Sequence, residues 1–441
     1  MADSNKHTPS LRFPEFLNDG EWKLAHIGRY YRLQGGFAFK SCYFKDSGIA
    51  VIRIANIPND GVFVDTSNCV YHEAITNDSN YIVSRGDLLI AMSGATTGKT
   101  AIFKEPHNAY LNQRVGLFKS INVDNYYPFL CQWVKSECFS RQLKRTLAAG
   151  AQPNISSKDI ESFVWAFPID SSSNKEQRKI ADCLTSLDRY IYNTKDKLER
   201  LKEHKCGLMQ RLFPAKGKNV PELRFPEFQN DGEWEEHTLS DIFTFIPNNT
   251  LSRANLNYEN GSVQNIHYGD VLIRFRECLN VQNEELPFIS DVQDIERYYK
   301  VKLVNGDVII ADTAEDETVG KCTELVGLTN EIIVSGLHTI AIRPNIIFAT
   351  GYLGFYMNSN SYREQLRQIM QGVKVLSISK TAISQTKLRF PSSISEQEKI
   401  ARSLSSINDE IKSYEDKISA LELHKRGLMQ QLFPDLPYET N

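Results

Sequence analysis

The chain has 441 residues, of which 41% are hydrophobic and 24% are charged, and its formal net charge is −3. This composition is ordinary for a folded protein of two or three domains and excludes global disorder, while the slight acidity is not typical of a nucleic-acid binder. The sequence contains neither an apolar export signal nor a run of eighteen apolar residues, so we expect a cytoplasmic protein that does not contact a membrane.

The eight cysteines are scattered along the chain, and none forms a C-x-x-C pair. This spacing argues against zinc ribbons and redox motifs. We therefore expect reduced, structural thiols and no bound metal.

A twelve-residue motif opens each half of the chain. LRFPEFLNDGEW at Leu11–Trp22 returns as LRFPEFQNDGEW at Leu223–Trp234, with eleven positions identical. Repetition at this distance indicates two tandem units, each built from an opening motif, a variable region and a long helix.

The two variable regions share only traces of a common plan. Arg85–Lys99 and Asn305–Lys321 both read as a Gly-Asp turn, an apolar strand and a small-residue loop that ends in Gly-Lys. Further on, Phe129–Leu147 and Tyr352–Met370 each have the pattern of one amphipathic helix. Strands mixed with helices at irregular spacing predict the α+β class, with two α/β globular domains.

Each variable region is followed by a long helix. Glu176–Pro214 and Glu396–Pro434 are identical at 20 of 39 positions, and both carry apolar residues at alternating steps of three and four. This heptad pattern requires a partner helix, and the second copy in the same chain supplies one, which predicts a paired coiled coil with pseudo-twofold symmetry. Asn174 and Ser395 are the predicted N-terminal caps. The predicted contacts between the helices are Leu184, Leu187, Ile191, Leu198, Leu201 and Leu208 with Leu404, Ile407, Ile411, Ile418, Leu421 and Leu428.

These patterns divide the chain into seven segments. They are a tail with the opening segment (1–21), a first domain (22–172), a central helix (173–214), a linker with the second opening segment (215–233), a second domain (234–393), a C-terminal helix (394–434) and a tail (435–441).

One loop resembles a phosphate-binding loop. GATTGKT at Gly94–Thr100 is one residue too short between its glycines, and its counterpart before Lys321 has lost the first glycine and the magnesium-binding hydroxyl. An ATPase site here is the first rival interpretation, but a tight loop that contacts DNA phosphates is favoured. The sequence contains no methyltransferase, nuclease or metalloprotease motif, so we expect no catalytic residue.

The remaining polar residues suit DNA contact. In the first unit Gly35 and Gly36 are interpreted as places where the backbone can approach a ligand, and Arg53 and Asn56 are read as part of an apolar strand. Arginine and asparagine side chains can make bidentate contacts to bases. The candidate DNA-binding residues are Lys40, Ser41, Arg53, Asn56, Ser93, Thr96, Thr97, Lys99, Gln152, Thr250, Ser252, Arg253, His267, Tyr268, Lys321 and Lys374.

Taken in order, these motifs resemble the specificity subunits of type I restriction-modification systems. The resemblance spans essentially the whole chain and is carried by the paired opening motifs, GGFAFKS with IRIANI, RGDLLIAMSG, LNQRVGLF, and the EQ-x-KIA and GLMQ-x-LFP ends of both helices. NTLSR with NIHYGD in the second unit is similar to one subclass of target recognition domain that the first unit does not share.

The resemblance implies two target recognition domains separated by two long antiparallel helices. Each domain would read one half of a split, asymmetric site in double-stranded DNA. The chain would have no catalytic activity of its own and would dock two methyltransferase subunits and, through them, two endonuclease and translocase subunits. S-adenosylmethionine, ATP and Mg²⁺ would belong to those partners. The alternative interpretation is a coiled-coil scaffold that binds proteins and reads no DNA.

Overall fold

The chain folds into two compact units, and both long helices contribute to each unit. In the computed structural model, unit 1 comprises Met1–Lys195 with Asp416–Asn441, and unit 2 comprises Asp196–Glu415. The structure describes residues 7–59, 62–75, 80–121, 126–148, 153–168, 173–434 and 436. This division runs through the long helices, whereas the sequence-based segments set each helix apart.

Unit 1 contains a four-stranded antiparallel sheet in the order β2-β9-β6-β7, a second sheet β4-β3-β8-β5 and the strand pair β1-β10. The strands are β1 Lys23–His26, β2 Tyr31–Gly35, β3 Ile49–Ile52, β4 Val70–His72, β5 Ile82–Val83, β6 Leu88–Ala91, β7 Thr100–Ile102, β8 Ala109–Leu111, β9 Val115–Ser120 and β10 Val164–Phe167. The helices are α1 Tyr127–Trp133, α2 Glu137–Ala148 and α3 Ser157–Glu161. They complete the mixed α and β composition predicted from the sequence.

Unit 2 repeats this plan with a larger main sheet, β12-β21-β17-β19-β15, beside β13-β16-β14-β20, β11-β23 and β18-β22. The strands are β11 Glu235–Thr238, β12 Phe243–Ile246, β13 Leu256–Asn257, β14 Gln264–Ile266, β15 Cys278–Asn280, β16 Phe288–Ile289, β17 Val308–Ala311, β18 Thr313–Ala314, β19 Cys322–Val326, β20 Ile333–Ser335, β21 Thr339–Pro344, β22 Leu376–Ser377 and β23 Lys387–Phe390. The helices are α5 Leu239–Ile242, α6 Tyr268–Ile273, α7 Ile295–Tyr299, α8 Tyr352–Asn358, α9 Asn360–Ile369 and α10 Lys380–Ser384. The two predicted apolar strands are β6 and β17, which lie inside the main sheets with every residue buried.

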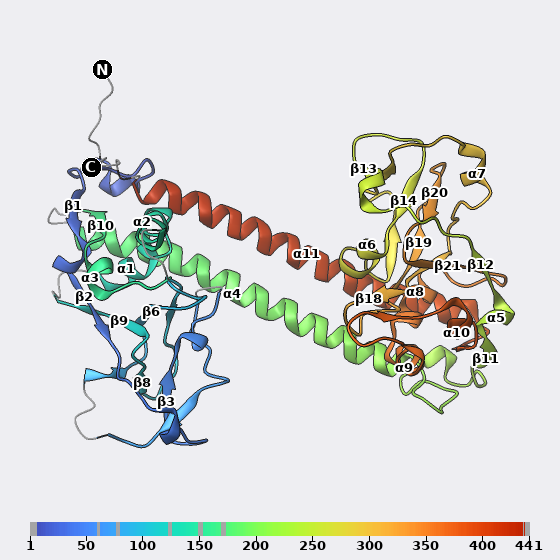
Figure 1. Ribbon diagram of the computed structural model, residues 1–441, viewed down its shortest axis with the longest axis horizontal. Coiled ribbons are helices and arrows are strands. Elements are labelled where there is room, and N and C mark those ends of the chain that lie inside the picture. Colours follow the sequence, from blue (N-terminus) through green and yellow to red (C-terminus); the bar gives the residue numbers. More distant parts are fainter. Residues whose placement is uncertain are drawn as a thin grey trace. The chain divides into compact units, whose positions relative to one another are not determined.

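The long helices are α4, Ser173–Leu212, and α11, Ile394–Leu432 (Figure 1). They run antiparallel, because Lys195 pairs with Glu422 within unit 1 and Lys202 with Glu415 within unit 2. The predicted contact residues of the two helices fall into the same burial class at equivalent positions. Leu184, Ile191, Leu198, Leu404, Ile411 and Ile418 are buried, and Leu187, Leu201, Leu208, Ile407, Leu421 and Leu428 are partly buried.

The predicted capping residue of the second long helix is wrong by two positions, although the helix begins at Ile394. Its capping side chain is Ser393, whose hydroxyl accepts a hydrogen bond from the Glu396 N–H at 3.3 Å, and Ser395 already lies inside α11. Asn174 likewise lies inside α4, which begins at Ser173.

The two predicted amphipathic helices are each broken in two, which corrects a second expectation. In unit 1 the break between α1 and α2 falls at Val134–Ser136, and the buried Ser136 hydroxyl accepts a hydrogen bond from the Phe139 N–H. In unit 2 the break falls at Ser359, whose extended backbone ends α8 and starts α9. Helical periodicity continues across both breaks in the sequence, so it does not reveal them.

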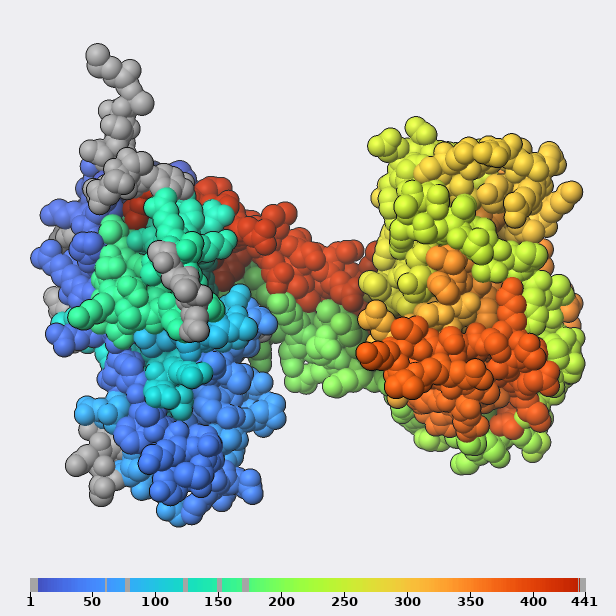
Figure 2. Space-filling view, in the orientation of Figure 1, coloured from blue at the N-terminus to red at the C-terminus, as the bar shows by residue number. Residues whose placement is uncertain are grey.

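The opening motifs join the two long helices within each unit. In unit 1 the Leu11 N–H donates to the Gln431 carbonyl near the end of α11, and the Arg12 guanidinium forms a bidentate ion pair with Glu176 near the start of α4. Met429, Leu432 and Phe433 complete the same core, and Figure 2 shows the red end of α11 against the blue and teal surface of unit 1. The chain therefore closes unit 1 with residues from both of its ends.

Unit 2 repeats this closure. The Leu223 N–H donates to the Arg211 carbonyl near the end of α4, and Arg224 forms a bidentate ion pair with Glu396 near the start of α11. The two closures match residue by residue, as the repeated sequences predict.

Candidate nucleic-acid interface

The loop between β6 and β7 presents Lys99 on the surface of unit 1. Gly94 and Gly98 have positive φ angles of 83° and 84°, and a Cβ atom on Gly98 would lie 2.1 Å from the Leu143 side chain. The glycines therefore permit a tight turn that packs on α2. Lys99 is followed directly by β7, whereas a phosphate-binding loop leads into a helix. The strand that follows Lys99 thus argues against the interpretation of this loop as an ATPase site.

The hydroxyl groups of this loop mainly hold the loop together. The Thr97 hydroxyl lies 2.6 Å from the carbonyl oxygens of both Gly94 and Pro153, and the Thr96 hydroxyl lies 3.5 Å from the Ile54 carbonyl. Ser93 is partly buried and bridges to Asn154. Lys99 is therefore the candidate in this loop whose side chain is most available to DNA.

The equivalent lysine of unit 2 lies in a different environment. Gly320 has the same backbone conformation as Gly98, with φ 81°, and packs against Leu366. The ammonium group of Lys321, however, donates to the Leu272 carbonyl at 2.8 Å, and burial lowers its pKa. One Gly-Lys motif thus gives an exposed cation in unit 1 and a partly buried one in unit 2.

Of the two glycines before Lys40, only Gly36 has a structural role, which the sequence did not reveal. A Cβ atom on Gly36 would lie 2.3 Å from the carbonyl oxygens of Leu111 and Asn112, so this residue must be small for its own chain to pack. Lys40 and Ser41 are exposed and stay available for contact with a ligand.

Arg53 and Asn56 lie in a turn rather than in a strand, which corrects the expectation for IRIANI. Strand β3 ends at Ile52, and a short 3-10 turn covers Ile54–Asn56. Asn56 is 2% exposed, and its amide accepts from the Arg53 N–H and donates to the Asp65 carbonyl. Asn56 therefore holds the turn together, and only the partly exposed Arg53 is presented for contact.

In unit 2 the predicted residues gather beside α6. The Arg253 guanidinium lies 2.6 Å from the buried carboxylate of Asp270. His267 is 5% exposed, its Nδ1 accepts from the Gly269 N–H, and burial lowers its pKa. His267 thus caps α6 as a neutral ring, while Arg253 is exposed and oriented by a carboxylate.

The remaining candidates differ in exposure. Thr250, Ser252 and Lys374 are exposed, and the Tyr268 ring is partly buried. Gln152 lies outside the described residues.

His338 is a candidate that the sequence analysis missed. It lies between β20 and β21, and its φ of 54° is unusual for a residue with a side chain. Its imidazole lies 3.2 Å from the Asp312 carboxylate and packs edge-on against Tyr268. No sequence signal marks this residue, because the contacts join segments far apart in the chain.

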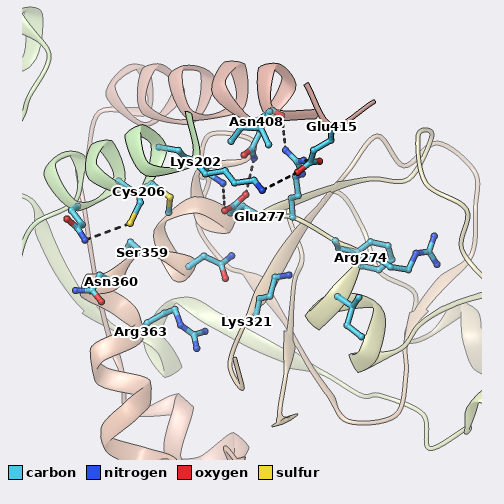
Figure 3. A pocket seen from close by; sticks show the side chains of 18 residues that line it. Lys202, Cys206, Arg274, Glu277, Lys321, Ser359, Asn360, Arg363, Asn408 and Glu415 are labelled. Atoms are coloured by element: carbon cyan, nitrogen blue, oxygen red, sulfur yellow. Dashed lines mark hydrogen bonds and ion pairs between the residues drawn. The ribbon is translucent and has the colours of Figure 1, made fainter. Parts of the chain in front are cut away.

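A cavity of about 630 Å³ opens in unit 2 between α4, the segment before β15, the α8–α9 junction and α11 (Figure 3). At its inner wall the Glu277 carboxylate accepts hydrogen bonds from Lys205 at 2.5 Å and Asn408 at 2.9 Å. Beside it Arg276 donates to the Asn408 carbonyl and pairs with Glu415. The wall therefore joins the globular part of unit 2 to both long helices.

The described ranges contain no helix long and apolar enough to span a membrane. They also contain no group of three or more His, Cys, Asp or Glu side chains arranged to hold a metal ion.

The amino-acid sequence is similar to a known protein family and to individual members of it. A family model described as the type I restriction modification DNA specificity domain matches residues 20–203 and again residues 231–423. The type I restriction enzyme MjaVIII specificity subunit of Methanocaldococcus jannaschii is 25% identical over 202 residues, which are 44% of this chain and 46% of that protein. The type I restriction enzyme EcoAI specificity subunit of Escherichia coli is 27% identical over 175 residues, 39% of this chain and 30% of that protein. The match thus spans less than half the length of these relatives.

Solved structures share the fold. The crystal structure of a type I restriction-modification system S subunit from M. genitalium covers 98% of this chain and 100% of that chain, with a TM-score of 0.58 and 14% identity. A structure from work on complex assembly and conformational transition of the type I R-M system covers 93% and 97%, with a TM-score of 0.52 and 13% identity. Because the family model matches most of the sequence in two successive copies, this chain belongs to the type I restriction modification DNA specificity family.

Proposed function

We propose that this chain is the DNA specificity subunit of a type I restriction-modification complex, in which each domain reads one half of a bipartite, asymmetric site. The observation that carries the proposal is the double match to the DNA specificity domain, with one copy in each half of the chain. The curated relatives, which are named specificity subunits, support it.

The candidate DNA contacts differ between the units, as reading two different half-sites requires. Unit 1 offers Lys40, Arg53 and Lys99, while unit 2 offers Arg253 and His338 beside α6. An arginine oriented by a carboxylate is pre-organised for a bidentate contact to guanine, and exposed lysines neutralise phosphates. Asn56 and His267 are not among the proposed contacts, because both side chains are buried and hydrogen-bonded within the fold, Asn56 through both amide atoms and His267 through Nδ1.

The long helices are proposed to space the two domains and to dock two methyltransferase subunits, which in turn recruit two restriction subunits. S-adenosylmethionine, ATP and Mg²⁺ are assigned to those partners, and this chain is assigned no catalytic step. The net charge of −3 supports this division, because basic partner surfaces then supply much of the attraction to phosphates. The logarithm of affinity should therefore fall more steeply with salt for the complex than for this chain alone.

The deciding experiment is to co-express the chain with its cognate methyltransferase subunit and to map methylated adenines across a genome by single-molecule sequencing. A single split motif is expected, and it would reveal both half-sites. A stable complex without any motif would instead support the scaffold alternative. That alternative also predicts that Lys40→Ala, Arg53→Ala and Arg253→Ala leave methylation unchanged.

The spacing role has its own test. Seven residues inserted within 187–201 of α4 alone should destabilise the helix pair, whereas matched insertions in α4 and α11 should lengthen the unread spacer between the half-sites. A spacer of unchanged length after matched insertion would contradict the spacing role.

A further inference from the structure

In unit 1 a helix carboxylate anchors the globular domain to the helix pair. Asp188 of α4 lies 2.5 Å from the ammonium group of Lys425 on α11 and 3.0 Å from that of Lys135, which follows α1. The Gln132 amide also donates to Asp188, at 3.1 Å. All three charged side chains are about 15% exposed. Burial alone would raise the pKa of Asp188, but the two lysines outweigh it and lower that pKa.

In unit 2 the corresponding carboxylate comes from the globular domain and not from a long helix. Asn408 occupies on α11 the position that Asp188 occupies on α4, and Lys205 corresponds to Lys425. The negative charge is supplied by Glu277, from the globular domain, which binds both Lys205 and Asn408. Burial is again outweighed, here chiefly by Lys205, so the pKa of Glu277 is lowered.

The domain residues change together with the helix residue. At the helix break, Lys135 of unit 1 corresponds to Asn358 of unit 2, because each directly precedes the buried serine, Ser136 or Ser359. Unit 2 thus has no lysine at the position of Lys135. The domain cations near this contact, Arg276 and Lys321, bind Glu415 and the Leu272 carbonyl instead.

The domain carboxylate is likewise present in one unit only. Counted from the Gly-Lys motif, Ile102 and Glu324 are equivalent, and they pair in parallel with Phe63 and Cys278 respectively. Val62 therefore stands where unit 2 has Glu277. Unit 1 therefore has its carboxylate on the helix and a lysine in the domain. Unit 2 has its carboxylate in the domain and an asparagine at the position of that lysine.

From this exchange we infer that the helix pair carries two docking surfaces of different charge, each of which accepts a globular domain of one kind only. The surface with Asp188 and Lys425 accepts a domain that brings a lysine. The surface with Asn408 and Lys205 accepts a domain that brings a carboxylate. This charge code restricts which kind of domain can pack on which of the two equivalent helix surfaces and hence, if the proposed function holds, which half-site readers each position accepts.

Docking in the wrong place would be penalised on both surfaces. The second domain on the first surface would place Glu277 beside Asp188 with one lysine between them. The first domain on the second surface would place Lys135 beside Lys205 without a carboxylate. Buried like charges oppose both arrangements, so each surface selects against the wrong domain as well as for the right one.

The code is tested by a double-mutant cycle in the full-length chain, read by peptide-level hydrogen exchange in 400–412 and 268–280. Asn408→Asp and Glu277→Gln should each speed exchange by about tenfold or more, because each leaves a buried charge wrongly compensated. The double variant should return to within about threefold of the original rate, since the carboxylate introduced on α11 then pairs with Lys205. Asn193→Asp, at an exposed position of α4, is the control and should change nothing. Additive losses in the double variant would overturn the inference.

A second variant tests the code itself. The regions 22–172 and 234–393 are exchanged in the full chain, with or without Asp188→Asn and Asn408→Asp together. Protection of α4 and α11 against hydrogen exchange should be lost in the plain exchange and regained when the two charges are exchanged as well. Equal protection in both chains would contradict the code. Neither readout requires DNA, so a failure here is distinct from a failure of the proposed function.

Discussion

The closures of the two units are the same, whereas their Gly-Lys loops have diverged. Arg12 and Arg224 pair with Glu176 and Glu396 at donor–acceptor distances of 2.6 to 2.8 Å, and in both pairs the glutamate is 1% exposed. Lys99 and Lys321 share a motif, yet one is exposed and the other donates to a carbonyl. The comparison shows that the repeated residues keep the same structural contacts in both units, whereas the same motif can present a different surface in each unit.

The largest effect is expected from breaking a closure. Arg12→Ala should destabilise unit 1, and Arg224→Ala unit 2, by about 3–5 kcal/mol each, because a buried carboxylate loses its partner. Urea unfolding measures both losses. Lys179→Ala, which removes the exposed pair with Glu15, should cost less than about 1 kcal/mol. Clearly unequal losses for the two arginines would show that the closures are alike in geometry only.

The next effect should appear in unit 2 alone. Burial raises the pKa of Glu324 to about 7, although the N–H groups of Gly351 and Gly354 donate to its carboxylate. Ile102 occupies this position in unit 1. A raised pKa in the folded state means that the contribution to stability is complete below about pH 4.5 and is lost as the pH rises through 7.

The loss should reach about 3 kcal/mol at pH 8. Urea unfolding at pH 4 and pH 8 measures it. Glu324→Gln should flatten the pH dependence of unit 2, and a variant that keeps the original slope would assign that slope to other groups.

Arg253 should affect which sequence is read more than how tightly DNA is held. Arg253→Ala should reduce discrimination at one base pair of the second half-site by about 1–3 kcal/mol, because a bidentate donor is lost. Methylation mapping would show relaxed specificity in that half-site only. Arg253→Lys keeps the charge but not the fork and serves as the matched variant. Relaxation of the first half-site would contradict the assignment of Arg253 to the second half-site.

The smallest expected effect is a difference between Lys99 and Lys321 in the salt dependence of DNA binding. Lys99→Ala should weaken DNA binding uniformly across sequences and reduce the slope of log affinity against log salt by about 1, as expected when one phosphate contact is lost. Lys321→Ala should leave that slope nearly unchanged, because its ammonium group is held by the Leu272 carbonyl. Titrations at several salt concentrations would measure both slopes. Equal reductions would mean that Lys321 leaves its carbonyl when DNA binds.

The sequence predicted what is local or repeated. The tandem units, the two long helices, their pairing and the buried strands β6 and β17 follow from periodicity and self-similarity, whereas the antiparallel direction of the helices is implied only by the family resemblance. It could not predict that Lys321 is partly buried or that Asn56 is enclosed, because their partners lie on other segments. It also missed His338, whose neighbours Asp312 and Tyr268 are brought to it only by the fold.

The closure of unit 1 has a consequence for synthesis on the ribosome. Unit 2 is one continuous stretch, Asp196–Glu415, so all of its contacts become available while the chain is still growing. Unit 1 needs the end of α11, because Leu11 bonds to Gln431 and Phe433 fills its core. Domains generally fold as units during translation, with the N-terminal domain first. Unit 1 departs from this rule, because the first half of the chain must wait for the last helix before its core is complete.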